Sequence, residues 1–263
     1  MLPLTEWRFH LLDASKNMNV MPGIDDDSGK IMILTEDTPD SPSVYTNAQG
    51  TALTETAGIA VLTFTNGQVR FWTDQSVTAL DISGITSDGR TFAMNSVTPS
   101  QQMIQVNPLN AHQLLVVPFG VSDNVETDTG IDLPANCLIT ADDIKLRVTT
   151  VDATETVDVG LLSSESGGDA NGFIAAGSVA TAGFVELLPQ ITGGTNIDYV
   201  STNYIGALAA TSIAGADAVA TVGGFTPKVY RTDGTAKSIT YTGSAGSDTA
   251  AGYLYISFRK LPF

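Results

Sequence analysis

The feature that most constrains the fold is the spacing of apolar residues, which recur at every second position or in short runs bounded by turn residues. In residues 144–149, for example, Ile144, Leu146 and Val148 share one face of an expected strand. No ten-residue window carries a capped apolar stripe of helical period. The pattern predicts an all-β protein with short or few helices, built as two β-sandwich or jelly-roll-like domains.

A turn between two strand-like runs gives a second structural prediction. Asn66-Gly67 separates residues 59–64 from residues 68–73. Both turn residues tolerate the positive φ angles that a tight type I′ turn demands. The sequence therefore predicts a β-hairpin at this point.

The domain boundary is predicted from an acidic, turn-rich stretch. Residues 120–134 carry Asp123, Glu126, Asp128 and Asp132 without a balancing base. Such a stretch is typical of a linker. We expect an N-terminal β domain with an extended arm over residues 1–119, a linker over residues 120–134, and a C-terminal β-sandwich over residues 135–263.

The charge limits the partners. A formal net charge of −16 repels phosphate backbones and anionic lipid headgroups, so neither nucleic acid nor a membrane is an expected partner. The first residues lack the basic and long apolar regions of a signal peptide, so synthesis and folding in a cytoplasm are expected.

No catalytic constellation is visible in the sequence. His10 and His112 lie far apart, Cys137 is the only cysteine, and the nucleophile-elbow, phosphate-loop and dinucleotide motifs are missing. Cys137 lies in an apolar run, which indicates a small buried side chain. We expect no enzymatic activity and no catalytic, cofactor-binding or metal-binding residues, although 28 acidic residues could include a pair suited to glycoside hydrolysis.

Two acidic loops and one aromatic cluster each allow two interpretations. Residues 25–29 and the loop Glu165–Asn171 resemble calcium loops in part, but both lack the remaining ligands, which favours solvated turns and Asx turns. Calcium binding at Glu165–Asn171 stays open. The cluster of Phe64, Phe71 and Trp72 is typical of a sandwich core, and a carbohydrate-stacking platform is the alternative.

Two segments carry a family resemblance. Residues 156–173, which read TVDVGLLSSESGGDANGF, resemble virion structural proteins of tailed bacteriophages, especially the β-sandwich decoration or cement proteins of the capsid. Residues 44–53 with 66–72 are similar to small β domains near the N-termini of phage fibres and spikes.

The resemblance implies a function and partners. It implies a capsid decoration protein on the virion surface. The implied partners are a shell of major capsid protein and further copies of the chain in a homotrimer. The alternatives are a head or tail fibre or its adaptor, and a carbohydrate-binding spike module. In the leading interpretation the N-terminal domain holds the shell and the C-terminal sandwich faces outward.

Two sets of candidate site residues follow. The N-terminal arm offers Trp7, Arg8 and Phe9 for attachment to the capsid, with Arg8 suited to an acidic shell. The alternative is that this strand completes its own domain. The aromatic final strand offers Tyr253, Tyr255 and Phe258 as an interface between subunits.

Overall fold

The protein is all-β. The computed structural model describes residues 3–13, 29–56, 58–65, 67–100, 103–106, 112–120, 124–185, 187, 190–192, 198–200, 205–212, 225–244 and 249–261. Within these ranges the helical structure consists of one turn of 3-10 helix, η1 (Ala141–Asp143). The chain divides into two compact units, Met1–Pro118 and Phe119–Phe263. The division falls inside strand β9 (Gln113–Gly120), next to the predicted boundary at residue 119.

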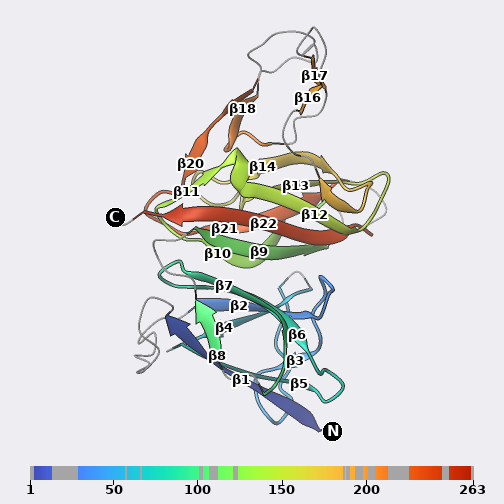
Figure 1. The fold of residues 1–263 in the computed structure, drawn as a ribbon, viewed down its shortest axis with the longest axis vertical. Coiled ribbons are helices and arrows are strands. Elements are labelled where there is room, and N and C mark those ends of the chain that lie inside the picture. Colours follow the sequence, from blue (N-terminus) through green and yellow to red (C-terminus); the bar gives the residue numbers. More distant parts are fainter. Residues whose placement is uncertain are drawn as a thin grey trace. The chain divides into compact units, whose positions relative to one another are not determined.

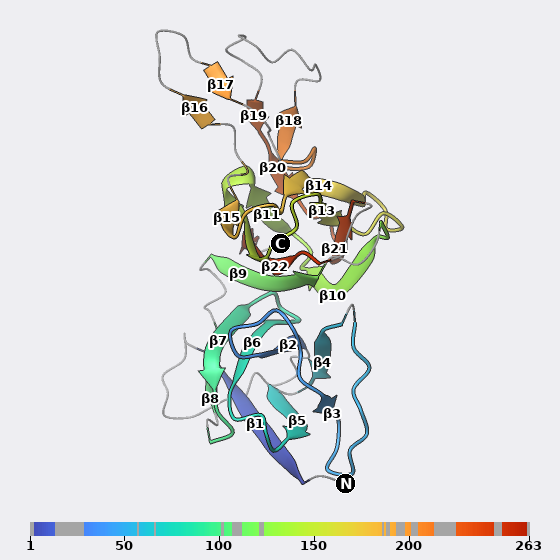
Figure 2. The same cartoon turned by 90° about the vertical axis from the view of Figure 1, so that its right-hand side faces the viewer.

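The N-terminal unit contains two four-stranded sheets. The first has the order β3-β5-β1-β8, with β1 (Leu4–Asp13), β3 (Val44–Tyr45), β5 (Gln68–Asp74) and β8 (Met103–Val106). The second has the order β4-β2-β6-β7, with β2 (Gly29–Thr35), β4 (Ala60–Phe64), β6 (Leu80–Thr86) and β7 (Thr91–Val97). Strands β1 and β5 lie side by side in both views and are antiparallel (Figure 1, Figure 2).

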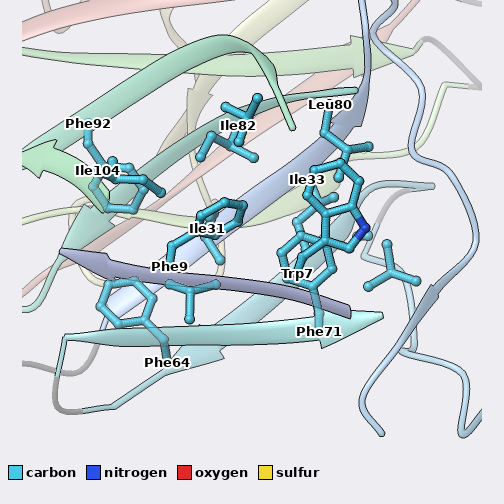
Figure 3. Close-up of a cluster of buried hydrophobic side chains, with 14 of the residues drawn as sticks. Trp7, Phe9, Ile31, Ile33, Phe64, Phe71, Leu80, Ile82, Phe92 and Ile104 are labelled. Carbon is cyan, nitrogen blue, oxygen red and sulfur yellow. The ribbon is translucent and has the colours of Figure 1, made fainter. Parts of the chain in front are cut away.

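An aromatic core joins these two sheets. The rings of Trp7 and Phe71 are stacked with centroids 5.9 Å apart, and Phe9 lies 6.1 Å from Phe71. Ile31 and Ile82 of the second sheet belong to the same buried cluster (Figure 3). Burial of such large rings stabilises the unit strongly, and the indole of Trp7 stays satisfied because its Nε1 donates to Thr73 Oγ1 over 2.9 Å.

The chain turns between Thr65 and Gln68, which form an isolated antiparallel bridge, but the described strands β4 and β5 do not pair beyond it, so the predicted hairpin does not extend into the strands. Gly67 has a φ of 61°, and the amide of Gln68 donates to the carbonyl of Thr65 over 3.1 Å. The flanking strands then diverge: β4 pairs with β2, whereas β5 pairs with β1 in the other sheet. The turn therefore connects the two sheets of this unit, since apolar side chains of both β4 and β5 pack in the core between these sheets.

The C-terminal unit is sandwich-like and has two main sheets. One sheet has the order β10-β21-β13-β14, with β10 (Thr127–Leu133), β13 (Thr156–Leu161), β14 (Asp169–Ser178) and β21 (Lys237–Gly243). The other has the order β15-β12-β22-β11-β20, with β11 (Cys137–Thr140), β12 (Ile144–Thr150), β15 (Gly183–Val185), β20 (Val229–Arg231) and β22 (Ala251–Lys260), and β9 also pairs with β22.

Two aromatic contacts join the layers of this unit. The rings of Phe119 and Tyr241 lie 6.3 Å apart, and those of Phe173 and Tyr230 lie 5.5 Å apart. The first contact links β9, which pairs with β22, to β21 of the other sheet. The second contact links β14 of one sheet to β20 of the other. Two short antiparallel pairs complete the unit: β16 (Gln190–Thr192) with β17 (Asp198–Val200), and β18 (Ala210–Ser212) with β19 (Phe225–Pro227) (Figure 2).

The structure differs from the expected linker over residues 120–134. Residues 127–133 form strand β10, which pairs with β21. Thr129, Ile131 and Leu133 are buried, while Asp128 and Asp132 lie on the other side. The carboxylates occupy the solvent side of a half-buried strand, so the acidic composition did not prevent a contribution to the core.

Candidate functional site

The N-terminal strand corrects part of the attachment prediction. Trp7 and Phe9 have 0% exposed surface because β1 pairs with both β5 and β8 and turns these rings into the core. They offer no apolar surface to a partner, and the alternative holds: the strand completes its own domain. Arg8, in contrast, lies on the exposed side of β1.

Arg8 lies directly opposite a second arginine. The register of β1 and β5 pairs Arg8 with Arg70, and both side chains are exposed. Like charges at directly opposed positions of a sheet are destabilising. The carboxylate of Glu6 relieves this on one side, since its Oε1 lies 2.7 Å from Arg70 Nε.

Two aromatic residues flank this arginine pair. The guanidinium carbon of Arg70 lies 4.8 Å from the centre of the Trp72 ring, a cation–π arrangement, and Tyr45 is the cross-strand neighbour of Trp72. We call the surface formed by Arg8, Arg70, Tyr45 and Trp72 the N-terminal basic face. Aromatic and arginine side chains together are typical of the energetic centre of protein interfaces.

The predicted aromatic cluster is mainly structural. Phe71 is fully buried against Trp7, and Phe64 is buried against Phe92 with ring centroids 6.2 Å apart. Trp72 retains 8% of its surface and lies beneath Arg70. The cluster therefore forms core rather than an open stacking platform.

Of the three residues predicted for the subunit interface, Phe258 is not available to a partner. Along β22 the side chains alternate: Phe258 is fully buried, Tyr253 keeps 9% of its surface and Tyr255 is half-buried. Phe258 therefore belongs to the interior of the sandwich and cannot reach a neighbouring subunit. The two tyrosines lie on the outer side of the sheet.

A second basic surface surrounds these tyrosines. Cross-strand register aligns Tyr255 with Lys145 and Tyr253 with Arg147, and it places Arg147 beside Phe184 of β15. Phe184 has 67% of its surface exposed, and its ring lies 5.7 Å from that of Tyr255. We call this surface the aromatic–basic face; it comprises Lys145, Arg147, Phe184, Tyr253, Tyr255 and Arg259.

The opposite sheet of the same unit carries carboxylates along its end strand β10. Ser238 Oγ donates to Asp132 Oδ1 over 3.0 Å, and the Ser238 amide donates to Glu165 Oε2 over 3.1 Å. Glu126 accepts from the amide of Ser163 over 2.8 Å. We call Glu126, Asp128, Asp132 and Glu165 the acidic edge.

The loop Glu165–Asn171 is organised by hydrogen bonds of its own. Asp169 Oδ1 accepts from the amide of Asn171 over 3.4 Å, which is an Asx-turn contact, and Lys237 Nζ donates to the carbonyl of Ser166 over 2.6 Å. Among the described residues, no group of three or more His, Cys, Asp or Glu side chains is arranged to hold a metal ion. The other predicted acidic turn, residues 25–29, lies outside the described residues except for Gly29.

Cys137 is buried, as its apolar sequence context predicted. Burial raises the pKa of its thiol, which keeps the side chain neutral. In the part of the chain that the structure describes, no helix is long and apolar enough to span a membrane.

Sequence reasoning missed most of both basic surfaces. Arg70, Lys145, Arg147 and Phe184 come from strands distant in sequence, and only cross-strand register brings them beside Arg8 or the tyrosines. The alternation of Lys145 and Arg147 with apolar residues was a usable signal for their exposure. No family model matches the chain, and neither the curated proteins nor the solved structures contain a match.

Proposed function

We propose that this chain is a structural component of a tailed-bacteriophage virion that decorates the capsid and acts by binding rather than by catalysis. Its partners are a shell of major capsid protein and further copies of itself in a homotrimer. Two features support the proposal: the resemblance of residues 156–173 to decoration proteins, and a sandwich-like all-β architecture. In this proposal the N-terminal unit attaches to the shell.

The observation that carries the attachment is the opposed pair Arg8 and Arg70. The chain has only 12 Lys and Arg residues against 28 Asp and Glu residues, yet two of the arginines are direct cross-strand neighbours on an exposed face. A carboxylate from a partner between the two guanidinium groups would relieve their repulsion. The N-terminal basic face therefore suits an acidic protein surface.

A head or tail fibre, or its adaptor, would use the same face in the same way and belongs to the same structural class. The carbohydrate-binding module has less support. Stacking on a sugar needs an open ring face, and Trp72 is almost covered, while Phe71 is inside the core.

Binding to undecorated particles tests the proposal. We expect wild-type protein to sediment with the particles and the variant Arg8→Glu/Arg70→Glu to bind at least about tenfold more weakly, since both contacts with carboxylates become repulsive. Lys228→Glu/Arg231→Glu is the matched control, because it makes the same charge change at exposed positions of the other unit, outside the aromatic–basic face. Full binding by Arg8→Glu/Arg70→Glu would exclude this face as the attachment surface.

Circular dichroism establishes that each variant is folded before it is compared. A parallel glycan-binding screen with a hydrolysis readout tests the alternative class. Specific binding or cleavage of a polysaccharide, without binding to particles, would replace the decoration function with the carbohydrate-binding one.

A further inference from the structure

The C-terminal unit carries two surfaces of opposite charge. The aromatic–basic face lies on the outer side of β15, β12 and β22, and the acidic edge lies along β10 of the other sheet. Lys145, Arg147 and Arg259 are exposed on the first surface, whereas the second combines four carboxylates. One molecule therefore presents both halves of a complementary electrostatic contact.

The two surfaces also match in apolar content. Phe184 is the most exposed of the described large hydrophobic side chains, with 67% of its surface accessible. Val125, next to Glu126 just before β10, has 61% of its surface accessible. An exposed ring surrounded by arginine and tyrosine is the composition found at the centre of interfaces, and an apolar side chain among the carboxylates provides a contact for it.

We propose that the aromatic–basic face of one copy packs on the acidic edge of a second copy. The inference rests on the self-association proposed above and assigns it to two specific surfaces. The contact is heterologous, since different patches of the two copies meet, so repetition gives a closed ring or an open chain according to the rotation between copies. A trimer is the smallest such ring.

The occupant is a second copy because both complementary partners are present on this one chain. The net charge of −16 opposes association at long range, so the contact has to bring the few cations directly against carboxylates. Added salt weakens the overall repulsion between two acidic copies, which favours association, and also weakens the local attraction between the two surfaces, which opposes it. Charge exchange between two variants is therefore a sharper test than salt dependence.

The experiment measures the mass of the full chain by sedimentation equilibrium at about 10–200 μM. The basic surface is reversed in Lys145→Glu/Arg147→Glu, and the acidic surface is reversed in Asp128→Lys/Asp132→Lys. We expect wild-type protein to exceed the monomer mass of 27.5 kDa and each variant alone to be monomeric. An equimolar mixture of the two variants should associate again, because the reversed face of one then meets the reversed edge of the other.

A third variant guards against misfolding of the charge-reversed proteins. Phe184→Ser changes an exposed side chain and should weaken self-association about tenfold or more in Kd while leaving the fold intact. The proposal is overturned by a wild-type monomer at the highest concentration, by variants that keep the wild-type mass, or by a mixture of folded variants that stays monomeric.

The two proposals can fail separately. Arg8→Glu/Arg70→Glu should keep the wild-type mass in solution and lose particle binding. If Lys145→Glu/Arg147→Glu loses self-association but not particle binding, the surfaces are assigned as proposed. Wild-type mass in Lys145→Glu/Arg147→Glu, with particle binding lost only in Arg8→Glu/Arg70→Glu, would remove the contact between copies and leave attachment standing.

Discussion

The two units place their aromatic side chains differently. In the N-terminal unit Trp7, Phe9 and Phe71 form the centre of the core, and each is completely buried. In the C-terminal unit Phe173 and Phe258 are buried in an interior that is mainly Ile, Val and Leu, whereas Phe184 and Tyr255 lie on the outer side of a sheet among basic residues. An aromatic side chain is therefore structural where a second sheet covers it and available for binding where its sheet faces solvent.

The largest expected effect on stability comes from removing a ring from the N-terminal core. Phe71→Ala should lower the free energy of unfolding of this unit by about 3–5 kcal/mol, because it removes a ring that contacts both Trp7 and Phe9. Both tryptophans of the chain, Trp7 and Trp72, lie in the N-terminal unit. Tryptophan fluorescence during urea unfolding therefore reports on this unit alone.

Phe184→Ala is the matched control for that change. It removes the same ring from an exposed site, so the free energy of unfolding should change by less than about 0.5 kcal/mol. Similar destabilisation by both substitutions would show that burial does not separate the roles of the two aromatic sets.

The second effect concerns a buried cation of the C-terminal unit. The side chain of Lys237 is 5% exposed, and its Nζ contacts the carbonyl of Ser166 at 2.6 Å and Asp233 Oδ2 at 3.3 Å. Lys237→Met should destabilise this unit by about 2 kcal/mol, since a charge-assisted hydrogen bond to the 162–169 loop is lost. Tyrosine near-ultraviolet circular dichroism measures the effect.

The tryptophan transition of the N-terminal unit should not move in Lys237→Met. Lys228→Met is the control, because the exposed Lys228 also donates to a carbonyl, that of Ala207, over 3.1 Å. An equally large loss of stability in Lys228→Met would mean that the burial of Lys237 adds nothing to the stabilisation.

Much of the fold could be predicted from local sequence pattern. The alternation of Trp7 and Phe9 with Arg8 correctly separates the two sides of β1, and the alternation in residues 144–149 correctly places Lys145 and Arg147 outside. Periodicity reports which side chains share a side of a strand. It does not report whether a second layer covers that side, which is why Trp7 and Phe9 could be taken for an exposed anchor.

The remaining differences arise from contacts between distant segments. Asn66-Gly67 predicts a turn, but whether β4 and β5 pair depends on competition from β2 and β1. Likewise β10 is a strand because β21, more than 100 residues later, pairs with it despite its acidic composition. The two basic surfaces have the same origin, since register alone brings Arg8 to Arg70 and Tyr253 to Arg147.

The third effect is a loss of stability at alkaline pH that is expected mainly in the C-terminal unit. Six of the seven tyrosines lie in the C-terminal unit. Burial raises the pKa of Tyr230 to about 12, and burial also raises the pKa of Tyr241. A raised folded-state pKa gives stability that is complete below the unfolded value of 10 and is lost as pH rises towards the folded value.

We therefore expect the C-terminal unit to lose stability between pH 10 and 12, by on the order of 1 kcal/mol from Tyr230 once its partial exposure is discounted. Urea unfolding at the two pH values, followed by near-ultraviolet circular dichroism, measures the loss. Tyr230→Phe should reduce it. An unchanged pH dependence in Tyr230→Phe would contradict the assignment.

The smallest effect lies in the turn between β6 and β7 of the N-terminal unit. Burial alone would raise the pKa of Asp88, but hydrogen bonds from Arg90 and Thr86 outweigh it and leave the pKa below its usual value of 3.8. Arg90 Nε lies 2.7 Å from Asp88 Oδ2. A lowered folded-state pKa gives stability that is present above the unfolded value and is lost as pH falls through the folded value.

Asp88→Asn should therefore destabilise the N-terminal unit by a few tenths of a kcal/mol at pH 7, because one partly exposed ion pair and its hydrogen bonds are weakened. The difference from wild type should shrink as the pH is lowered below 3.8, since protonation then removes the same charge from the native protein. Tryptophan fluorescence follows the unit selectively, and Asp40→Asn at an exposed site is the control. A difference that persists undiminished in acid would show that Asp88 acts through the shape of the turn rather than through its charge.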